Sequence, residues 1–221
     1  MLDIFGVGFI LIAIVILLKV VKIIKVKFYL SDEVGRKSIH IAMGLTICSF
    51  PWLFSSSFVV WGLAVLVSIL FMSIRYYKRF NGVGEALYSV NRTTYGELYF
   101  TWGMAILFEL ASSPLLFIVP VLILTFSDAI AALVGVRYGT KTITIFGSKR
   151  SIEGSSAFVL SSFIIIAGAL YFVGGFSIAI VMSYSLLMAL VLSIVEAVSV
   201  HGLDNFTLPL GTLLLLELIL I

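Results

Sequence analysis

Long apolar runs alternate with short polar segments along the whole chain. The runs have the length, roughly 17–25 residues, that a helix needs to cross the hydrocarbon core of a bilayer. Helix is the expected conformation of each run because lipid offers no partners for backbone N–H and C=O groups. Cutting the runs at their polar flanks predicts eight spans, at about 3–22, 37–54, 56–74, 95–112, 114–136, 154–173, 176–199 and 205–221. The pattern therefore predicts an all-α polytopic membrane protein.

The composition strengthens this interpretation. Of the 221 residues, 62% are hydrophobic and only 11% are charged, whereas about a quarter of the residues in a soluble domain are charged. In water such a chain would leave much apolar surface exposed, and a bilayer removes that cost. No linker or low-complexity segment interrupts the pattern, so residues 1–221 are expected to form a single transmembrane domain.

The basic residues predict the orientation in the membrane. All 14 Lys and Arg residues fall in alternate connections between the predicted spans: Lys19, Lys22, Lys25, Lys27, Arg36, Lys37, Arg75, Lys78, Arg79, Arg92, Arg137, Lys141, Lys149 and Arg150. Since short basic loops stay on the cytoplasmic side, we expect the N-terminus outside and the basic face in the cytoplasm. The same placement argues against nucleic-acid binding, despite the net charge of +3, because short loops form no folded basic face.

Five carboxylates are expected to approach this basic face. They are Glu97, Asp128, Glu153, Glu196 and Asp204. Because a carboxylate in hydrocarbon costs about 2.5–3.5 kcal/mol on insertion scales, each one requires a reason. Carboxylates beside Lys and Arg suit a site for a metal ion and phosphate groups. The alternative is that they form polar contacts between helices and charges that reach the lipid headgroups.

Small residues follow Asp128 on one face of the predicted helix. Ala131, Ala132 and Gly135 lie three, four and seven positions after it, which places them on the same side. Small residues let membrane helices approach closely. Packing accounts for the alanines but not for the carboxylate, so Asp128 is a candidate functional residue.

A second segment, from Phe146 to Ser156, combines glycines, hydroxyls and two adjacent cations directly before a predicted helix. The N–H groups and the dipole at a helix N-terminus favour an anion. No G-x-x-x-x-G-K-[ST] motif occurs in the chain, so this is not a Walker A loop. The segment predicts anion binding, with an ordinary basic loop as the alternative.

A third segment, residues 196–209, places two carboxylates and Asn205 around Gly202, between two predicted spans. Non-helical backbone at membrane depth is tolerated where it lines a polar cavity. His201 in this segment is expected to be a solvated loop residue. His40, one turn inside the second span, is a better candidate for a polar or catalytic role.

Several motifs occur in the order found in one family of membrane enzymes. They are Arg36-Lys37-x-x-His40, Thr94-Tyr95-Gly96-Glu97-Leu98-Tyr99-Phe100, Ser127-Asp128 with Gly135, Gly147-Ser148-Lys149-Arg150-Ser151-Ile152-Glu153-Gly154, and Gly202-Leu203-Asp204-Asn205 with Pro209. With these motifs the chain, over about residues 35–212, resembles the polyprenol kinase family, which includes dolichol kinase, phytol kinase and CTP-dependent diacylglycerol kinase. That family is itself similar to the CDP-diacylglycerol synthases.

The resemblance implies transfer of a phosphoryl group from CTP to the hydroxyl of a long-chain isoprenoid alcohol (dolichol, polyprenol or phytol), with Mg²⁺. It implies that Asp128, Asp204 and Glu153 bind the metal ion, and we expect Asp128 to accept the alcohol proton. The residues implied in catalysis are Asp128, Lys149, Arg150 and Glu153. Those implied in nucleotide binding are Gly147, Ser148, Lys149, Arg150, Ser151, Gly154 and Asn205, and further candidates are Arg36, Lys37, His40, Glu97 and Glu196.

Two other functions stay open. The first is cytidylyl transfer to make a CDP-lipid. The CDP-diacylglycerol synthases carry a longer signature with a second aspartate, which Asp204-Asn205 lacks here, so phosphoryl transfer is favoured. The second is a small transporter, whose polar path would continue to the outer side, whereas the outer halves of these spans are almost purely apolar.

The expected location is a prokaryotic plasma membrane, with a multi-pass chain and an active site at the cytoplasmic face. There a soluble nucleotide and a membrane-bound alcohol can meet. The sequence leaves the oligomeric state open, a homo-oligomer included.

Overall fold

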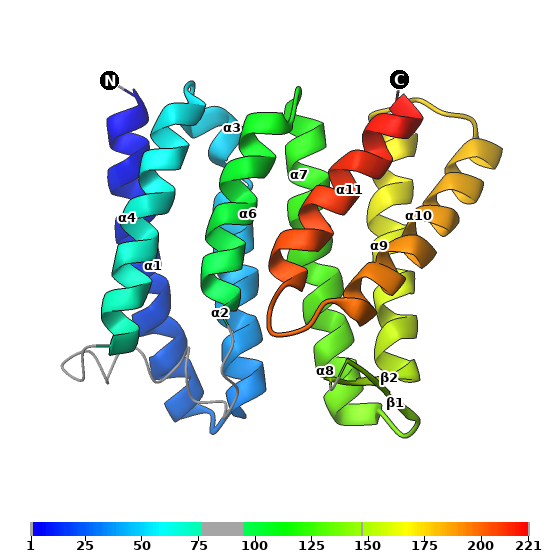
Figure 1. The fold of residues 1–221 in the computed structure, drawn as a ribbon, viewed down its shortest axis with the longest axis horizontal. Coiled ribbons are helices and arrows are strands. Elements are labelled where there is room, and N and C mark those ends of the chain that lie inside the picture. Colours follow the sequence, from blue (N-terminus) through cyan, green and yellow to red (C-terminus); the bar gives the residue numbers. More distant parts are fainter. Residues whose placement is uncertain (1, 77–94, 147, 221) are drawn as a thin grey trace.

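The computed structural model describes residues 2–76, 95–146 and 148–220, and most of them are helical. The helices stand side by side and alternate in direction, with both chain ends at the same edge (Figure 1). Among the described residues, five helical stretches are long and apolar enough to cross a membrane: Asp3–Lys27, Ser57–Tyr76, Pro114–Tyr138, Ile152–Phe172 and Ile178–Val198. The predicted all-α polytopic membrane fold is confirmed.

The described helices and strands follow one another through short connections. In chain order they are α1 (Leu2–Lys27), α2 (Asp32–Ile47), α3 (Phe50–Leu53), α4 (Ser57–Tyr76), α6 (Gly96–Leu110), α7 (Pro114–Leu122), the π-helical η2 (Ile123–Ser127), α8 (Asp128–Tyr138), β1 (Thr142–Ile145), β2 (Ser148–Ser151), α9 (Ile152–Phe172), α10 (Ile178–Val198) and α11 (Asp204–Leu220). Some residues named in the sequence analysis lie outside the described ranges: Lys78, Arg79, Arg92, Thr94 and Gly147.

Three of the eight predicted spans correspond to shorter helices. Helix α2 begins at Asp32, before the predicted start, because Ser31 caps it by accepting a hydrogen bond from the N–H of Val34 (3.4 Å). The predicted span 37–54 then divides, and Pro51 lies in the first turn of the separate helix α3. Helices α6 and α11 have 15 and 17 residues. For these three stretches, membrane crossing stays a prediction.

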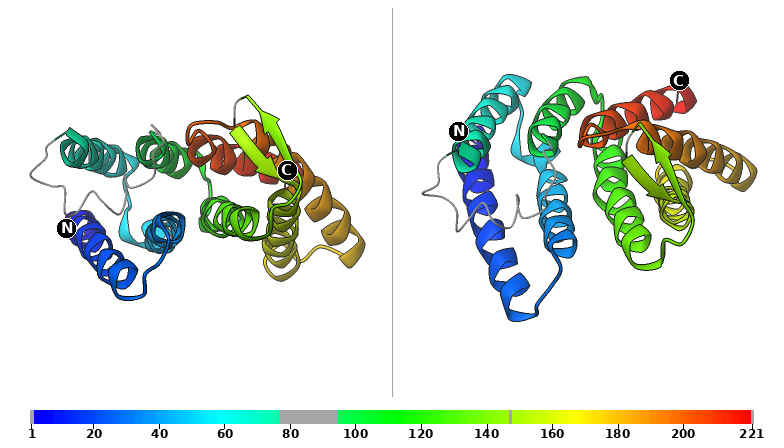
Figure 2. Two further views of the ribbon diagram at one scale, coloured as in Figure 1. Left: turned by 90° about the horizontal axis from the view of Figure 1, so that it is seen from below. Right: turned by 60° about the horizontal axis from the view of Figure 1, so that its bottom comes forward.

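The polar segment before α9 forms a hairpin, whereas the sequence analysis predicted a loop. Strands β1 and β2 pair antiparallel, with Ile143 opposite Arg150. The alternation of Thr and Ile in β1 suits a strand because both are β-branched. Four alternating residues in a polar segment were too short a pattern to indicate this. The hairpin lies at the edge of the molecule opposite the chain ends (Figure 1), so it faces the reader in the view from below (Figure 2).

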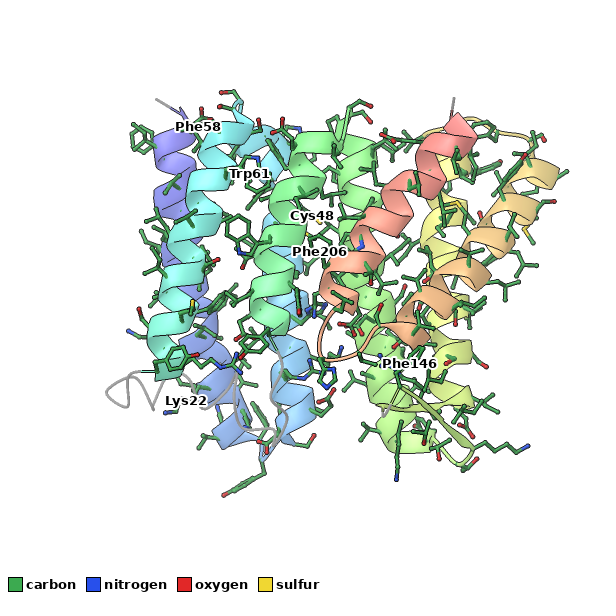
Figure 3. All side chains as sticks on the ribbon, in the orientation of Figure 1. Lys22, Cys48, Phe58, Trp61, Phe146 and Phe206 are labelled. Atoms are coloured by element: carbon green, nitrogen blue, oxygen red, sulfur yellow. The ribbon has the colours of Figure 1, made fainter. Side chains whose placement is uncertain are left out.

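The outer surface of the helices is apolar, as expected in lipid. Phe58, Leu160 and Ile194 are each more than half exposed, and such side chains project along the whole height of the molecule (Figure 3). Lys22 lies in the lower part of this view, and Trp61 lies in the upper part. The basic end of α1 and the hairpin therefore share one edge, as the predicted orientation requires.

Small residues bring two pairs of helices close together. A Cβ atom at Gly154 would lie 2.8 Å from the carbonyl oxygen of Ala131, so α9 packs directly on the small-residue face that follows Asp128, as the sequence predicted. A Cβ atom at Gly44 would lie 1.9 Å from Oγ1 of Thr125. Helix α2 therefore touches η2, the segment immediately before Asp128.

Candidate active site

Three carboxylates from three helices meet in the lower half of the bundle. Asp128 begins α8, Glu196 lies in the last turn of α10, and Asp204 begins α11. Each offers one carboxylate oxygen, and these oxygens all lie within 4.8 Å of one another. Asp128 and Glu196 are buried, each with 3% of its surface exposed. Negative charges at this separation repel strongly, so nearby cations are needed to stabilise the group.

Asp128 is positioned by an irregular stretch of helix. Pro120 lies inside α7, and the next five residues form the π-helical segment η2. The N–H of Asp128 bonds the carbonyl of Ile123, five residues earlier. A π-helical turn widens the helix and changes the direction of the side chains that follow, and such segments occur frequently at functional sites. Two hydroxyls of η2, those of Thr125 and Ser127, are buried without a hydrogen-bond partner within the described parts of the chain.

The connection between α10 and α11 lies well above the level of the hairpin (Figure 1). Phe206, in the first turn of α11, accordingly lies near mid-height (Figure 3). The backbone of His201 and Gly202 has positive φ angles of 57° and 89°, which reverse the chain direction. Residues 199–203 are non-helical, as the sequence indicated, and this turn directs Asp204 toward the other two carboxylates.

Asn205 holds this turn together. Its side-chain amide donates to the carbonyl oxygen of Gly202 (3.1 Å) and to Oδ1 of Asp204 (3.2 Å). The resemblance implied that Asn205 binds the nucleotide. In the structure its side chain instead contacts the Asp204 carboxylate and the turn before it. Asn205 is only 9% exposed, so its contacts orient a member of the carboxylate group.

Lys37 and His40 reach Asp128 from α2. Lys37 Nζ donates to Asp128 Oδ2 (2.5 Å), and both side chains are buried. His40 Nε2 lies 2.9 Å from the carbonyl oxygen of Leu124 in η2, and 3.6 Å from Asp128 Oδ2. Because a carbonyl oxygen only accepts, Nε2 carries a proton and donates it. Both candidates from the Arg36-Lys37-x-x-His40 motif thus lie at the site.

Arg150 connects the hairpin to the other two carboxylates. Its Nη1 atom lies 2.7 Å from Glu196 Oε1, and its Nη2 atom lies 3.9 Å from Asp204 Oδ2. Nη2 also donates to the carbonyl oxygens of Ser199 (2.9 Å) and Glu196 (3.1 Å). Its neighbour Lys149 is exposed, because successive side chains of a strand point to opposite sides. The two adjacent cations therefore have different surroundings.

Glu153 lies apart from the carboxylate group. Its Oε1 atom accepts hydrogen bonds from the N–H (3.1 Å) and hydroxyl of Thr140 and from the N–H of Lys141 (3.4 Å). These bonds fasten the start of the hairpin to the start of α9. The resemblance implied Glu153 as a metal ligand together with Asp128 and Asp204, but the carboxylate that lies beside these two is that of Glu196. Thr140 was not singled out because nothing in its sequence context distinguishes it.

Other predicted residues serve the local structure or form separate pairs. Ser151 caps α9 by accepting from the N–H of Gly154 (3.0 Å). Ser148 pairs with Ile145 through the strand backbone. Two further candidates, Arg36 and Glu97, are paired with residues outside the carboxylate group. Arg36 Nη2 lies 2.6 Å from Glu33 Oε1, and Glu97 Oε1 lies 3.0 Å from Arg75 Nη1. The structure thus does not bring Glu97 into the group.

Comparison with known proteins identifies the family. No protein-family model matches the sequence, and no solved structure matches it. A phytol kinase from Synechocystis sp. is 30% identical over 186 residues, which cover 83% of this chain and 78% of that protein. The implied further likeness to CDP-diacylglycerol synthases stays a prediction. A match of this identity over most of both chains establishes that the protein belongs to the polyprenol and phytol kinase family.

Proposed function

We propose that this protein is a membrane kinase that transfers the γ-phosphoryl group of CTP to the hydroxyl of a long-chain isoprenoid alcohol of the dolichol, polyprenol or phytol type. The observation that carries the proposal is the group formed by Asp128, Glu196 and Asp204, with Lys37 and Arg150 bonded to it. Buried carboxylates and cations inside an apolar bundle suit a reaction between a charged nucleotide and a lipid. The kinship with a phytol kinase supports the same reaction class.

The donor atoms of the group fit Mg²⁺. Asp128, Glu196 and Asp204 offer three carboxylate oxygens within 4.8 Å, and Mg²⁺ prefers hard oxygen ligands, commonly carboxylates together with substrate phosphates. These three residues would hold the ion. When bound, it neutralises negative charge on the phosphate oxygens. Glu196 replaces Glu153 in this proposal because Glu153 is bonded to Thr140 and Lys141 instead.

Positioning and charge neutralisation are the main requirements of phosphoryl transfer. Arg150 presents a planar guanidinium group, which pairs well with phosphate oxygens. Lys149 is exposed on the same strand and is available to the outer part of the nucleotide. The alcohol oxygen attacks the γ-phosphorus, the bond from this phosphorus to the bridging oxygen breaks, and CDP leaves. Asp128 accepts the alcohol proton.

The first test is a labelling experiment with the purified protein in detergent. Protein and Mg²⁺ are incubated with γ-³²P-CTP or γ-³²P-ATP and with polyprenol, dolichol, phytol or diacylglycerol, and lipids are separated by thin-layer chromatography. We expect label from CTP in an isoprenoid alcohol, and no label after chelation of Mg²⁺. Asp128→Asn should lower the rate at least about 100-fold, as loss of a charged catalytic group does.

Asp3→Asn is the matched control for this substitution. Asp3 bonds Ser55 at the opposite edge of the molecule, so the same chemical change there should leave the rate near that of the unchanged protein. Label in a lipid from α-³²P-CTP, together with pyrophosphate release, would replace the kinase proposal with cytidylyl transfer. Absence of label from every nucleotide would reject both reactions.

A further inference from the structure

A groove of about 820 Å³ runs between α9 and α10 and is lined at one end by the hairpin. One wall is formed by α9 from Ile152 to Phe163, and the other by α10 from Ala197 to Met182. The lining residues of each helix recur three or four positions apart, so each wall is one continuous helix face. At 1.5 Å per residue the α10 wall is ~22 Å long, which exceeds half of the ~30 Å hydrocarbon thickness.

The two ends of the groove differ in polarity. Arg150, Ser151, Ser155 and Ser156 line the end next to the hairpin, whereas large apolar side chains line most of the remainder. Arg150 belongs to both sites, because its guanidinium also bonds Glu196 of the carboxylate group (2.7 Å). A ligand in the groove would therefore place a polar head at the carboxylate group and an apolar tail along the helices.

The hairpin supplies apolar cover at the polar end. Within β1, Ile143 and Ile145 line the groove, and the alternating Thr142 and Thr144 are not among its lining residues. Ile143 is 54% exposed, and it alternates with the threonines of β1. Ile143 and Ile145 therefore add apolar surface to the end of the groove that also contains Arg150.

The long side of the groove is open toward lipid. Leu186 and Leu190 on its α10 wall are 49% and 48% exposed, so a chain in the bilayer can enter sideways. Transfer from lipid into the groove removes no apolar surface from water, so affinity depends on packing and on the polar head rather than on the hydrophobic effect. The groove would therefore select between lipids by the shape of their chains and by the polar head group that lies beside Arg150.

We infer that this groove is the acceptor site and that it holds the isoprenoid chain of the lipid alcohol, with the hydroxyl at the Arg150 end. This inference rests on the proposed function and deepens it, because it names where the acceptor binds. The occupant is an alcohol with a long branched chain. A phospholipid acyl chain in the same groove is the competing outcome.

A photoaffinity experiment tests binding without relying on catalysis. The whole protein in phosphatidylcholine nanodiscs is irradiated with an isoprenoid alcohol that carries a diazirine near the far end of its chain, and labelled peptides are identified by mass spectrometry. We expect label on residues 159–163 of α9 and 182–190 of α10. Unlabelled isoprenoid alcohol should remove the label, whereas added phosphatidylcholine should not.

Two adjacent leucines provide matched variants. Leu186 lines the groove, whereas its neighbour Leu187, which is 58% exposed, is not among the lining residues. Leu186→Trp should reduce labelling and raise KM for the alcohol about fivefold, the size of a lost packing contact between membrane-embedded groups. KM for the nucleotide should stay unchanged. Leu187→Trp should behave like the unchanged protein in both measurements.

Failure of the inference and failure of the proposed function have different signatures. Label on α1 or α4, label that phosphatidylcholine displaces, or equal effects of the two tryptophans would overturn the groove as the acceptor site, even if the kinase assay succeeds. Competed label in the groove without phosphorylation of any alcohol would instead retain the binding site and reject the kinase activity.

Discussion

The ion pair between Lys37 and Asp128 lies inside the bundle, where its two charges depend on each other. The side chains are 4% and 5% exposed, and the charged atoms are 2.5 Å apart. Removing one partner of such a pair leaves an uncompensated buried charge, which commonly costs about 3–5 kcal/mol, whereas replacing both is far less costly. Lys37 therefore contributes to stability as well as to the charge of the candidate active site.

Lys37→Met should lower the free energy of unfolding by about 3 kcal/mol because it strands the Asp128 carboxylate. The double variant Lys37→Met/Asp128→Asn removes both charges and should regain most of the lost stability, but not phosphoryl transfer. Thermal unfolding in detergent, followed by size-exclusion chromatography, measures the first effect. Lys19→Met, at an exposed position of α1, is the control, and a double variant less stable than Lys37→Met would contradict the explanation.

Arg150 and Lys149 are neighbours in strand β2, but their side chains have different surroundings. Both were expected to bind the triphosphate, yet the pleat directs Arg150 to Glu196 and leaves Lys149 exposed. The planar guanidinium also bonds the backbone carbonyl of Glu196 in the last turn of α10 and that of Ser199, the first residue after this helix. A lysine at position 150 could not reproduce this fork of donors.

At the scale of the elements, the contact between α2 and η2 sets the distance from Lys37 and His40 to Asp128. Gly44 lies where the two segments are closest, because any side chain there would occupy the space of Thr125. The π-helical turns of η2 then lead directly into Asp128. A substitution that separates the two segments should disturb the site without touching any charged residue.

Gly44→Ala should destabilise the protein by about 1–3 kcal/mol, the usual cost of overpacking a close contact, and should lower activity further by moving α2 away from Asp128. Gly62→Ala in α4 is the matched control, because a Cβ atom there has no neighbour within 4 Å. It should be neutral or slightly stabilising, since alanine favours helix. Thermal unfolding and the ³²P assay check both variants. Equal behaviour of the two would show that the α2–η2 contact is unimportant.

At the scale of the whole molecule, the predicted orientation would turn the edge nearest the candidate site toward the cytoplasm, where the proposed nucleotide substrate is dissolved. The α1–α2 connection and the hairpin lie at one edge, and the two chain ends lie at the other (Figure 1). The apolar exterior between these edges matches a protein surrounded by lipid. This arrangement is the reason to expect the basic edge in the cytoplasm.

Cysteine labelling in intact cells tests this orientation. In a Cys48→Ser background, Tyr29→Cys lies between α1 and α2, and Ser112→Cys lies between α6 and α7, both at exposed positions. A membrane-impermeant maleimide should modify position 112 in intact cells and position 29 only after permeabilisation. Modification of position 29 alone in intact cells would reverse the predicted orientation.

The sequence by itself determined the helical membrane fold and the position of the charges along it. Long apolar runs in lipid have few alternatives to helix, and the same runs predicted that Asp128, Glu196 and Asp204 would approach one edge. The small residues after Asp128 correctly predicted close packing, which occurs against Gly154 of α9. These properties follow from the order of residues within one helix or loop.

The tertiary structure decided which of the candidate residues meet. Lys37 and Asp128 are separated by 91 positions, and Arg150 and Glu196 by 46. No local sequence pattern specifies contacts between residues so far apart in the chain. These contacts depend on how the helices pack, on the π-helical segment before Asp128 and on the position of the α10–α11 connection. For this reason Glu196, rather than Glu153, joins Asp128 and Asp204. Periodicity fixes the face of a helix on which a residue lies, whereas packing fixes the residue that it faces.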